Sequence, residues 1–101
     1  MVSINWTDEA IFWLKDIHDY IALDNPKIAK KVINEIFTKT QILATFPKVG
    51  YLYEDDTNNE VRILLYGHYR IAYLIKDIKT IDILGVFHGA LVIERYLPVQ
   101  I

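Results

Sequence analysis

Residues 61–88 read VRILLYGHYRIAYLIKDIKTIDILGVFH, and this stretch decides the fold. Three runs rich in β-branched and aromatic residues alternate with short turn-forming clusters, a pattern typical of antiparallel strands joined by tight connections. The predicted strands are Val61–Leu65, Tyr69–Ile75 and Ile81–Phe87. We therefore expect a three-stranded antiparallel meander at the centre of the domain.

The pairing of the second and third strands follows from the polar connection between them, residues 76–80. If Ile75 lies opposite Ile81, then Tyr73 lies opposite Ile83, because side chains along a strand alternate between faces. The same alternation places Phe87 on this face of the sheet. We expect that face to be the buried one.

The connection between the first two strands, Gly67-His68, permits two registers. A two-residue hairpin of the Gly-X kind would place Arg62 on the buried face. One additional loop residue, or a bulge, would reverse the parity and bring Arg62 to the face of Arg70. Burying a guanidinium is far costlier than burying an aliphatic side chain, so we predict the longer loop. The buried face then gains Val61, Ile63 and Leu65, and the opposite face brings together Arg62, Arg70, His68 and His88.

Composition indicates a single globular domain over residues 1–101, with 52% hydrophobic and 24% charged residues. No apolar run approaches the roughly 20 residues that span a bilayer, and the first residues do not resemble a signal peptide. The absence of cysteine fits a cytoplasmic protein. A net charge of −2 argues against a general electrostatic grip on nucleic acid and leaves room only for a local basic patch.

The N-terminal half predicts a short strand over Val2–Trp6 and two amphipathic helices. Thr7 caps the first helix, and Asn25-Pro26 opens the second. The second helix ends near Phe46, before Pro47. The apolar stripe of the first helix comprises Ala10, Trp13, Leu14, Ile17, Tyr20 and Ile21. The lysines of the second helix are interpreted as a solvated face.

Residues 47–60 are interpreted as a long polar loop, which lacks the spacing of a calcium-binding loop, so no metal site is expected. The predicted fold class is α+β in two layers, with an N-terminal strand, an α-helical hairpin and the three-stranded meander. Two helices cover only one face of such a sheet, and the other face requires a partner, a ligand or the C-terminal tail. We expect this open face to carry Arg62, Leu64, Tyr66, His68, Arg70, Ala72, Leu74, Leu84, Val86 and His88.

Several short motifs occur in an order that resembles a known family. They are Trp6-Thr7 with Ala10, Asn25-Pro26, Phe46-Pro47-x-x-Gly50, Arg62-x-Leu64, Tyr69-Arg70-Ile71-x-Tyr73 and Val86-x-His88-Gly89. Together they resemble the RelE/ParE superfamily of toxins from bacterial type II toxin–antitoxin modules, in its ParE-like, plasmid-stabilisation branch. The resemblance runs from about Trp6 to Gly89.

The resemblance implies a small toxin, associated with stress response and plasmid stabilisation, that a cognate antitoxin holds inactive. ParE-like members act on DNA gyrase by contact. RelE-like members enter the ribosome and cut mRNA without a metal, through attack of a ribose 2′-hydroxyl on the neighbouring phosphate. That reaction needs cations for the charged transition state and a general acid and base.

The residues at the positions that correspond to the nuclease site favour inhibition of gyrase by contact over cleavage of mRNA. Arg70 matches an arginine of the RelE-type nucleases, and Arg62 and His88 would complete a catalytic set. However, Leu64 and Ala90 stand where the nucleases carry further basic residues. We therefore expect a gyrase inhibitor that is not an enzyme and needs no cofactor or metal. A RelE-like mRNA interferase acting on the ribosome, or an attenuated toxin that only binds, remains the alternative, and self-association is allowed.

The residues expected to bind the antitoxin or the target come from the open sheet face and from the tail after it. The tail, Gly89–Pro98, is apolar and is expected to pack on the domain or on a partner. The full set is Arg62, Leu64, Arg70, Leu74, Leu84, Val86, His88, Arg95 and Tyr96.

Overall fold

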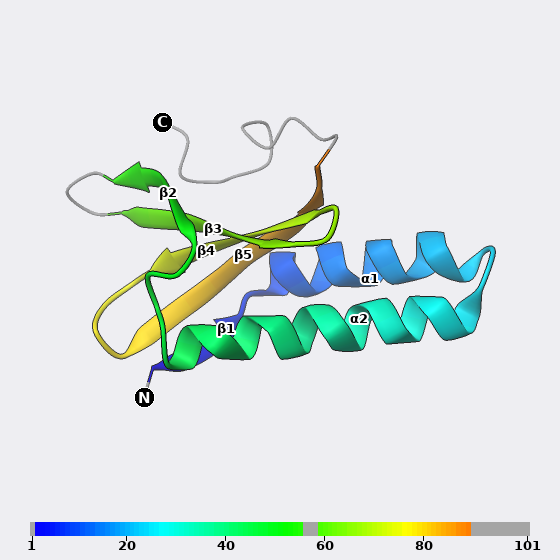
Figure 1. Ribbon diagram of the computed structural model, residues 1–101, viewed down its shortest axis with the longest axis horizontal. Helices are drawn as coiled ribbons and strands as arrows, with labels where there is room; N and C mark the ends of the chain where they lie inside the picture. The colour runs from blue at the N-terminus through cyan, green and yellow to red at the C-terminus, as the bar shows by residue number, and fades with distance from the viewer. Residues whose placement is uncertain (1, 56–58, 90–101) are drawn as a thin grey trace.

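The computed structural model describes residues 2–55 and 59–89 and shows a sheet with two helices packed on one side (Figure 1). This arrangement confirms the predicted α+β class, with an N-terminal strand, a helical hairpin and a meander. The elements in chain order are β1 (Ser3–Trp6), α1 (Asp8–Ala22), α2 (Pro26–Thr40), the 3₁₀ turn η1 (Gln41–Ala44), β2 (Tyr51–Asp55), β3 (Glu60–Tyr66), β4 (Tyr69–Ile75) and β5 (Thr80–His88).

Both helices begin where their capping residues predict. The Thr7 side-chain oxygen accepts a hydrogen bond from the Ala10 amide at 3.1 Å, and Asn25 does the same for Ile28 at 3.1 Å. These contacts satisfy amide groups that have no partner within the helix. Pro26 occupies the first turn of α2, where its missing N–H is harmless.

The sheet has five strands in the order β1-β5-β4-β3-β2. β1 runs parallel to β5, with Ser3 opposite Thr80, so β1 forms one edge of the sheet beside a strand that lies far from it in the sequence. The sequence-based prediction of a polar loop over residues 47–60 missed β2, which pairs antiparallel with β3. Its signal is the run Tyr51-Leu52-Tyr53, which has high strand propensity but stands between polar segments.

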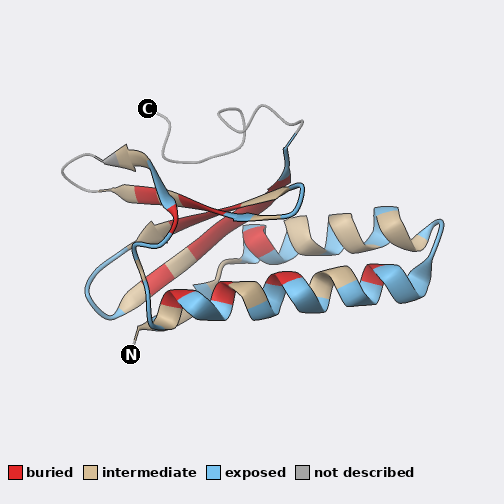
Figure 2. Cartoon of the chain, viewed as in Figure 1, coloured by how far each residue is buried: buried red, intermediate tan, exposed pale blue. Residues whose placement is uncertain are grey.

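The main core lies between the helices and one face of the sheet (Figure 2). α1 and α2 pack against each other, and α1 also packs along β5. Ala10 and Ile36 are fully buried where the helices meet the strands. The buried sheet residues of this core are Leu64, Ile71, Tyr73, Ile81, Ile83 and Val86.

The β3–β4 hairpin has the two-residue turn, so the prediction of a longer loop is wrong. Tyr66 pairs with Tyr69, and Gly67 occupies the left-handed region at φ 56°. Arg62 therefore lies opposite Tyr73, on the face of the helices. Arg70 lies on the other face, opposite Leu65.

The reversed parity moves other residues as well. Leu64 and Tyr66 share the helix face with Arg62, whereas Val61 and Ile63 are buried in a second cluster on the opposite face. Leu65, predicted to be buried, is 56% exposed.

A β-bulge in β5 produces a second difference. Tyr73 pairs with Ile83 as predicted, but the register shifts before Ala72, which lies opposite Gly85. One additional residue in β5 reverses the alternation beyond that point. Phe87 therefore lies in the second cluster and Val86 in the main core, the reverse of the prediction. Leu84, predicted for the face away from the helices, lies there.

The helical hairpin extends past the end of the sheet (Figure 1). The part of α1 that lies over strands has the predicted inward stripe, with Leu14 and Ile17 packed on the core. Tyr20 was predicted to continue that stripe but is 78% exposed, and Leu23 is 87% exposed. The periodicity was that of a buried face, but no strand lies beneath the second half of the helix.

Candidate functional site

Arg62 is held by its neighbours in the fold. Its Nε donates to the Glu60 carboxylate at 2.8 Å, and its Nη1 donates to the carbonyls of Gly50 at 2.7 Å and Lys48 at 3.2 Å. Only 17% of its side chain is exposed. A charged group with these partners fixes the segment before β2 against β3, which is a structural role.

Arg70 lies at the opposite end of the hairpin, in a small hollow around the β3–β4 turn. His68 and His88 stand beside it with their rings stacked at 6.2 Å between centroids, and Tyr69 meets His88 edge-on at 5.8 Å. The Gly89 amide donates to the His68 carbonyl at 2.7 Å and closes the hollow. The residues that line it are Leu65, Gly67, His68, Tyr69, Arg70, His88 and Gly89.

A groove continues from this hollow toward the far half of α1. Tyr69 and His88 line both the hollow and the groove, so the two are neighbours at this end of the sheet. The remaining lining residues of the groove are Trp13, Asp16, Ile17, Asp19, Tyr20, Ile21, Leu23 and Val86. We call the hollow and the groove together the α1–turn recess.

The α1–turn recess combines an apolar wall with polar groups at its mouth. Tyr20 and Leu23 expose large apolar surfaces to water. Contact of such surfaces with water is unfavourable, and they often mark binding sites. Asp19 bonds Lys15 at 2.9 Å, and that contact lowers the pKa of the carboxyl. Burial raises the pKa of Tyr69, which keeps its hydroxyl protonated at neutral pH.

The structure divides the residues that the sequence predicted for binding. Arg70, Val86 and His88 line the α1–turn recess. Leu74 and Leu84 belong to the second cluster on the face away from the helices, and Leu64 is buried beneath the helices. Arg95 and Tyr96 lie outside the described residues.

The predicted meeting of Arg62, Arg70, His68 and His88 is therefore only half correct. The hollow unites Arg70 with the two histidines, and Arg62 is excluded because it lies on the other face and three pairs further along the hairpin. The sequence reasoning missed Tyr69, Asp19 and Leu23 as lining residues, because the recess depends on α1 extending past the sheet.

Two kinds of site are absent from the part of the chain that the structure describes. Over residues 2–55 and 59–89, no three histidine or carboxylate side chains gather in a way that could hold a metal ion. None of the helices within those ranges has the length and apolar character needed to cross a membrane.

Comparison with known families places this architecture. The model of the ParE toxin of type II toxin–antitoxin systems, parDE, matches residues 4–92. The chain belongs to the ParE toxin family. Its match begins in β1 and passes through the hollow at the β3–β4 turn, so it includes every element described above. Membership makes this protein a toxin whose expected partner is a cognate antitoxin.

Solved structures share the ParE fold. A chain described as the chromosomal ParDE TA system from P. aeruginosa matches with a TM-score of 0.68 and 23% sequence identity. The match covers 87% of this chain and 96% of that chain. No curated protein sequence is close enough to count as a relative.

Proposed function

We propose that this ParE toxin inhibits DNA gyrase by binding to it, without a bond-making step of its own. The proposal combines the family resemblance with the positions of the two arginines. Arg62 and Arg70 lie on opposite faces of the β3–β4 hairpin. A nuclease that cleaves phosphodiesters needs cations converging on one phosphate, and these two do not converge.

The bonds of Arg62 strengthen this reasoning. The guanidinium is committed to Glu60 and to two main-chain carbonyls, so bringing it to a substrate would break three hydrogen bonds. Charge-assisted hydrogen bonds of this kind are about twice as strong as neutral ones. Arg62 therefore supports the fold of the toxin in either mechanism, and among the described residues that line the hollow Arg70 is the one arginine.

A contact mechanism needs a surface that gains by being covered, and the α1–turn recess provides one. Its apolar walls include Tyr20 and Leu23, and Phe12, about two turns before Tyr20 in α1, is 65% exposed. Phe12 stacks edge-on with Trp13, which in turn meets Phe87 at 4.8 Å between ring centroids. Large aromatic residues held in place by neighbours are typical anchors of protein interfaces.

One observation favours the alternative, a RelE-like mRNA interferase. Arg70, His68, His88 and Tyr69 surround one hollow, and histidine is a common general acid and base in catalysis. This set contains one cation and candidate groups for proton transfer. The described residues of the hollow do not include a second fixed cation. An attenuated toxin would have the same recess and would only bind.

The deciding experiment adds the purified protein to two assays. We expect it to inhibit the supercoiling of relaxed plasmid by gyrase and to leave a translated message intact, as read by primer extension. Cleavage within ribosomal A-site codons that disappears in Arg70→Ala would establish the nuclease instead. Activity in neither assay, with antitoxin binding retained, would indicate the attenuated form.

Matched variants separate the contributions. Arg70→Ala is expected to weaken gyrase inhibition only a few-fold, because one contact of a half-buried side chain with gyrase would be lost and no reaction depends on it. Lys79→Ala removes an exposed cation at the β4–β5 turn and is the control. Deleting residues 91–101, which lie outside the described part of the structure, is expected to abolish inhibition, since the apolar tail is proposed to contact gyrase.

A further inference from the structure

The two helices carry opposite charge. α1 holds four carboxylates and one lysine, whereas α2 holds four lysines and one carboxylate, Glu35. These four lysines are a large share of the 11 basic residues in a chain whose net charge is −2. The positive charge of the protein is thus concentrated on one exposed helix, and its members are Lys27, Lys30, Lys31 and Lys39.

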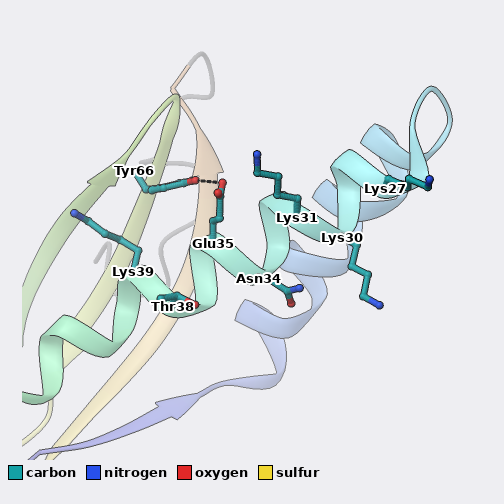
Figure 3. Close-up of a pocket in the computed structure, with 8 residues that line it drawn as sticks. All are labelled: Lys27, Lys30, Lys31, Asn34, Glu35, Thr38, Lys39 and Tyr66. Atoms are coloured by element: carbon teal, nitrogen blue, oxygen red, sulfur yellow. Dashed lines mark hydrogen bonds between the residues drawn. The ribbon is translucent and has the colours of Figure 1, made fainter.

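The lysines of α2 are not used inside the fold. Among the described residues, every ion pair of a lysine involves Lys15, Lys48 or Lys76, and none involves a lysine of α2. Glu35 is the one carboxylate beside them, and it accepts a hydrogen bond from the Tyr66 hydroxyl (Figure 3). This bond raises the pKa of Tyr66 and holds Glu35 toward the sheet.

The helix geometry arranges these groups as a band. At 100° per residue, Lys27, Lys31, Asn34 and Thr38 fall within about 60° of one another. Lys30 lies about 40° beyond one edge of this group and Lys39 about 80° beyond the other. Figure 3 shows Lys31 and Lys39 on the side of α2 that faces Tyr66 and Lys30 on the other side. From Lys27 to Lys39 the band is about 18 Å long at 1.5 Å per residue.

The position of Lys27 at the start of α2 also opposes the helix dipole. The first turn of α1 carries Asp8 and Glu9, which the positive end of a helix favours, but the first turn of α2 contains Lys27 and no acid. Local stability therefore does not account for the lysines at this end. A function that uses positive charge does.

We infer that the lysine band of α2 binds the phosphate backbone of duplex DNA. The duplex carries one charge per about 1.7 Å of its axis, so an 18 Å band lies against roughly ten phosphates. Lysine, asparagine and threonine are side chains that bind phosphates without reading bases. Tyr66 is the aromatic residue of the lining and its hydroxyl is bonded to Glu35, so charged groups outnumber the apolar anchors that a protein partner would need.

This inference goes beyond gyrase inhibition and does not depend on it. DNA binding is measured on the toxin alone, so its failure leaves the gyrase proposal untouched, and the reverse also holds. If both are correct, α2 touches DNA while the α1–turn recess contacts the protein.

The test measures the affinity of the full chain for a labelled 20-base-pair duplex by fluorescence anisotropy between 50 and 200 mM salt. Four phosphate contacts predict that log K falls against log salt with a slope of about −3.6. Neutralising two of them in Lys27→Gln/Lys31→Gln should reduce the slope by about 2 and the affinity at 0.1 M salt by about 60-fold. Glutamine is a good helix former, so the fold is retained and circular dichroism verifies it.

The control is Lys76→Gln/Lys79→Gln, which removes the same charge at the β4–β5 turn. An equal loss of affinity in this control would overturn the lysine band in favour of net charge alone. A slope near zero for the unmodified chain would exclude phosphate contacts altogether. Binding of a 20-residue poly-glutamate at least tenfold tighter than the duplex would assign the band to an acidic protein segment instead.

Discussion

The Tyr73 hydroxyl joins the sheet to the segment before β2, and its removal gives a sharp test of how the fold is held. Tyr73 is fully buried, its hydroxyl donates to the Pro47 carbonyl at 2.8 Å, and it accepts from the Gly50 amide at 3.0 Å. Tyr73→Phe deletes one oxygen and leaves the shape of the ring unchanged. Both partners lose their bond, and the buried Gly50 amide has no water to replace it.

The expected loss follows from these two bonds. Each is worth about 0.5–1.5 kcal/mol net, and an unsatisfied buried amide adds to the penalty, so the free energy of unfolding should fall by about 2–3 kcal/mol. For a domain of this size that corresponds to a decrease in melting temperature of about 10–20 °C. Gly50 cannot move away easily, since a Cβ placed on it would lie only 2.6 Å from the Ile63 carbonyl oxygen.

The assay is urea unfolding followed by tryptophan fluorescence, with the slope of free energy against urea compared between variants. Tyr20→Phe is the matched control, because its side chain is 78% exposed, and it should change stability by less than about 0.5 kcal/mol. A loss below about 1 kcal/mol in Tyr73→Phe, at equal slope, would refute the idea that this hydroxyl fastens the segment.

Four further predictions use the same fold. Gly85→Ala should lower stability by about 1–3 kcal/mol in thermal unfolding, because the added methyl would lie 2.5 Å from the buried ring of Phe87; a neutral effect would contradict the tight bulge. Arg62→Met should lower stability and gyrase inhibition together, since it removes the bonds to Glu60 and to the carbonyls of Lys48 and Gly50; a stable but inactive variant would instead assign Arg62 to the target surface. Burial raises the pKa of Tyr73, so the folded state favours the neutral hydroxyl. The free energy of unfolding should therefore be at its maximum below pH 10 and decrease as the pH rises above it. In Tyr73→Phe this decrease should be less steep. A cognate antitoxin should raise the melting temperature, as any ligand selective for the native state does, and a melting point unchanged at saturating antitoxin would contradict its role.

The local features of this fold can be predicted from its sequence. Thr7 and the pair Asn25-Pro26 start helices through contacts within four residues, so their neighbours in the sequence suffice. The pairing of Tyr73 with Ile83 likewise depends on one short polar turn. Each of these features was predicted and is confirmed.

The register of the β3–β4 hairpin could not be predicted in the same way. Avoiding a buried arginine is sound reasoning when the guanidinium has no partner. Here the fold supplies partners, because Lys48 and Gly50 bring two carbonyls from the segment before β2. The favourable turn at Gly67 can be read from the sequence. The hydrogen-bond partners that offset the cost of burying Arg62 come from tertiary contacts and cannot.

The candidate site shows the same division. Arg70, His68 and His88 were predicted to lie together, and they do, because all three are near the ends of neighbouring strands. The groove beyond them depends on α1 being longer than the sheet beneath it. A helical stripe shows which side of a helix is apolar, and it does not show where the covering strands end.

The parallel pairing of β1 with β5 has a consequence for synthesis of the protein. Ile4 lies opposite Ile81, so β1 has no neighbour in the sheet until β5 has been synthesised. β5 also stands between β1 and β4, and a chain that stops before residue 80 lacks the strand that joins them. The helical hairpin is local and forms early, whereas such distant pairing forms late. A translation product that ends before β5 therefore has no complete sheet, and the hollow at the β3–β4 turn lacks His88 and Gly89.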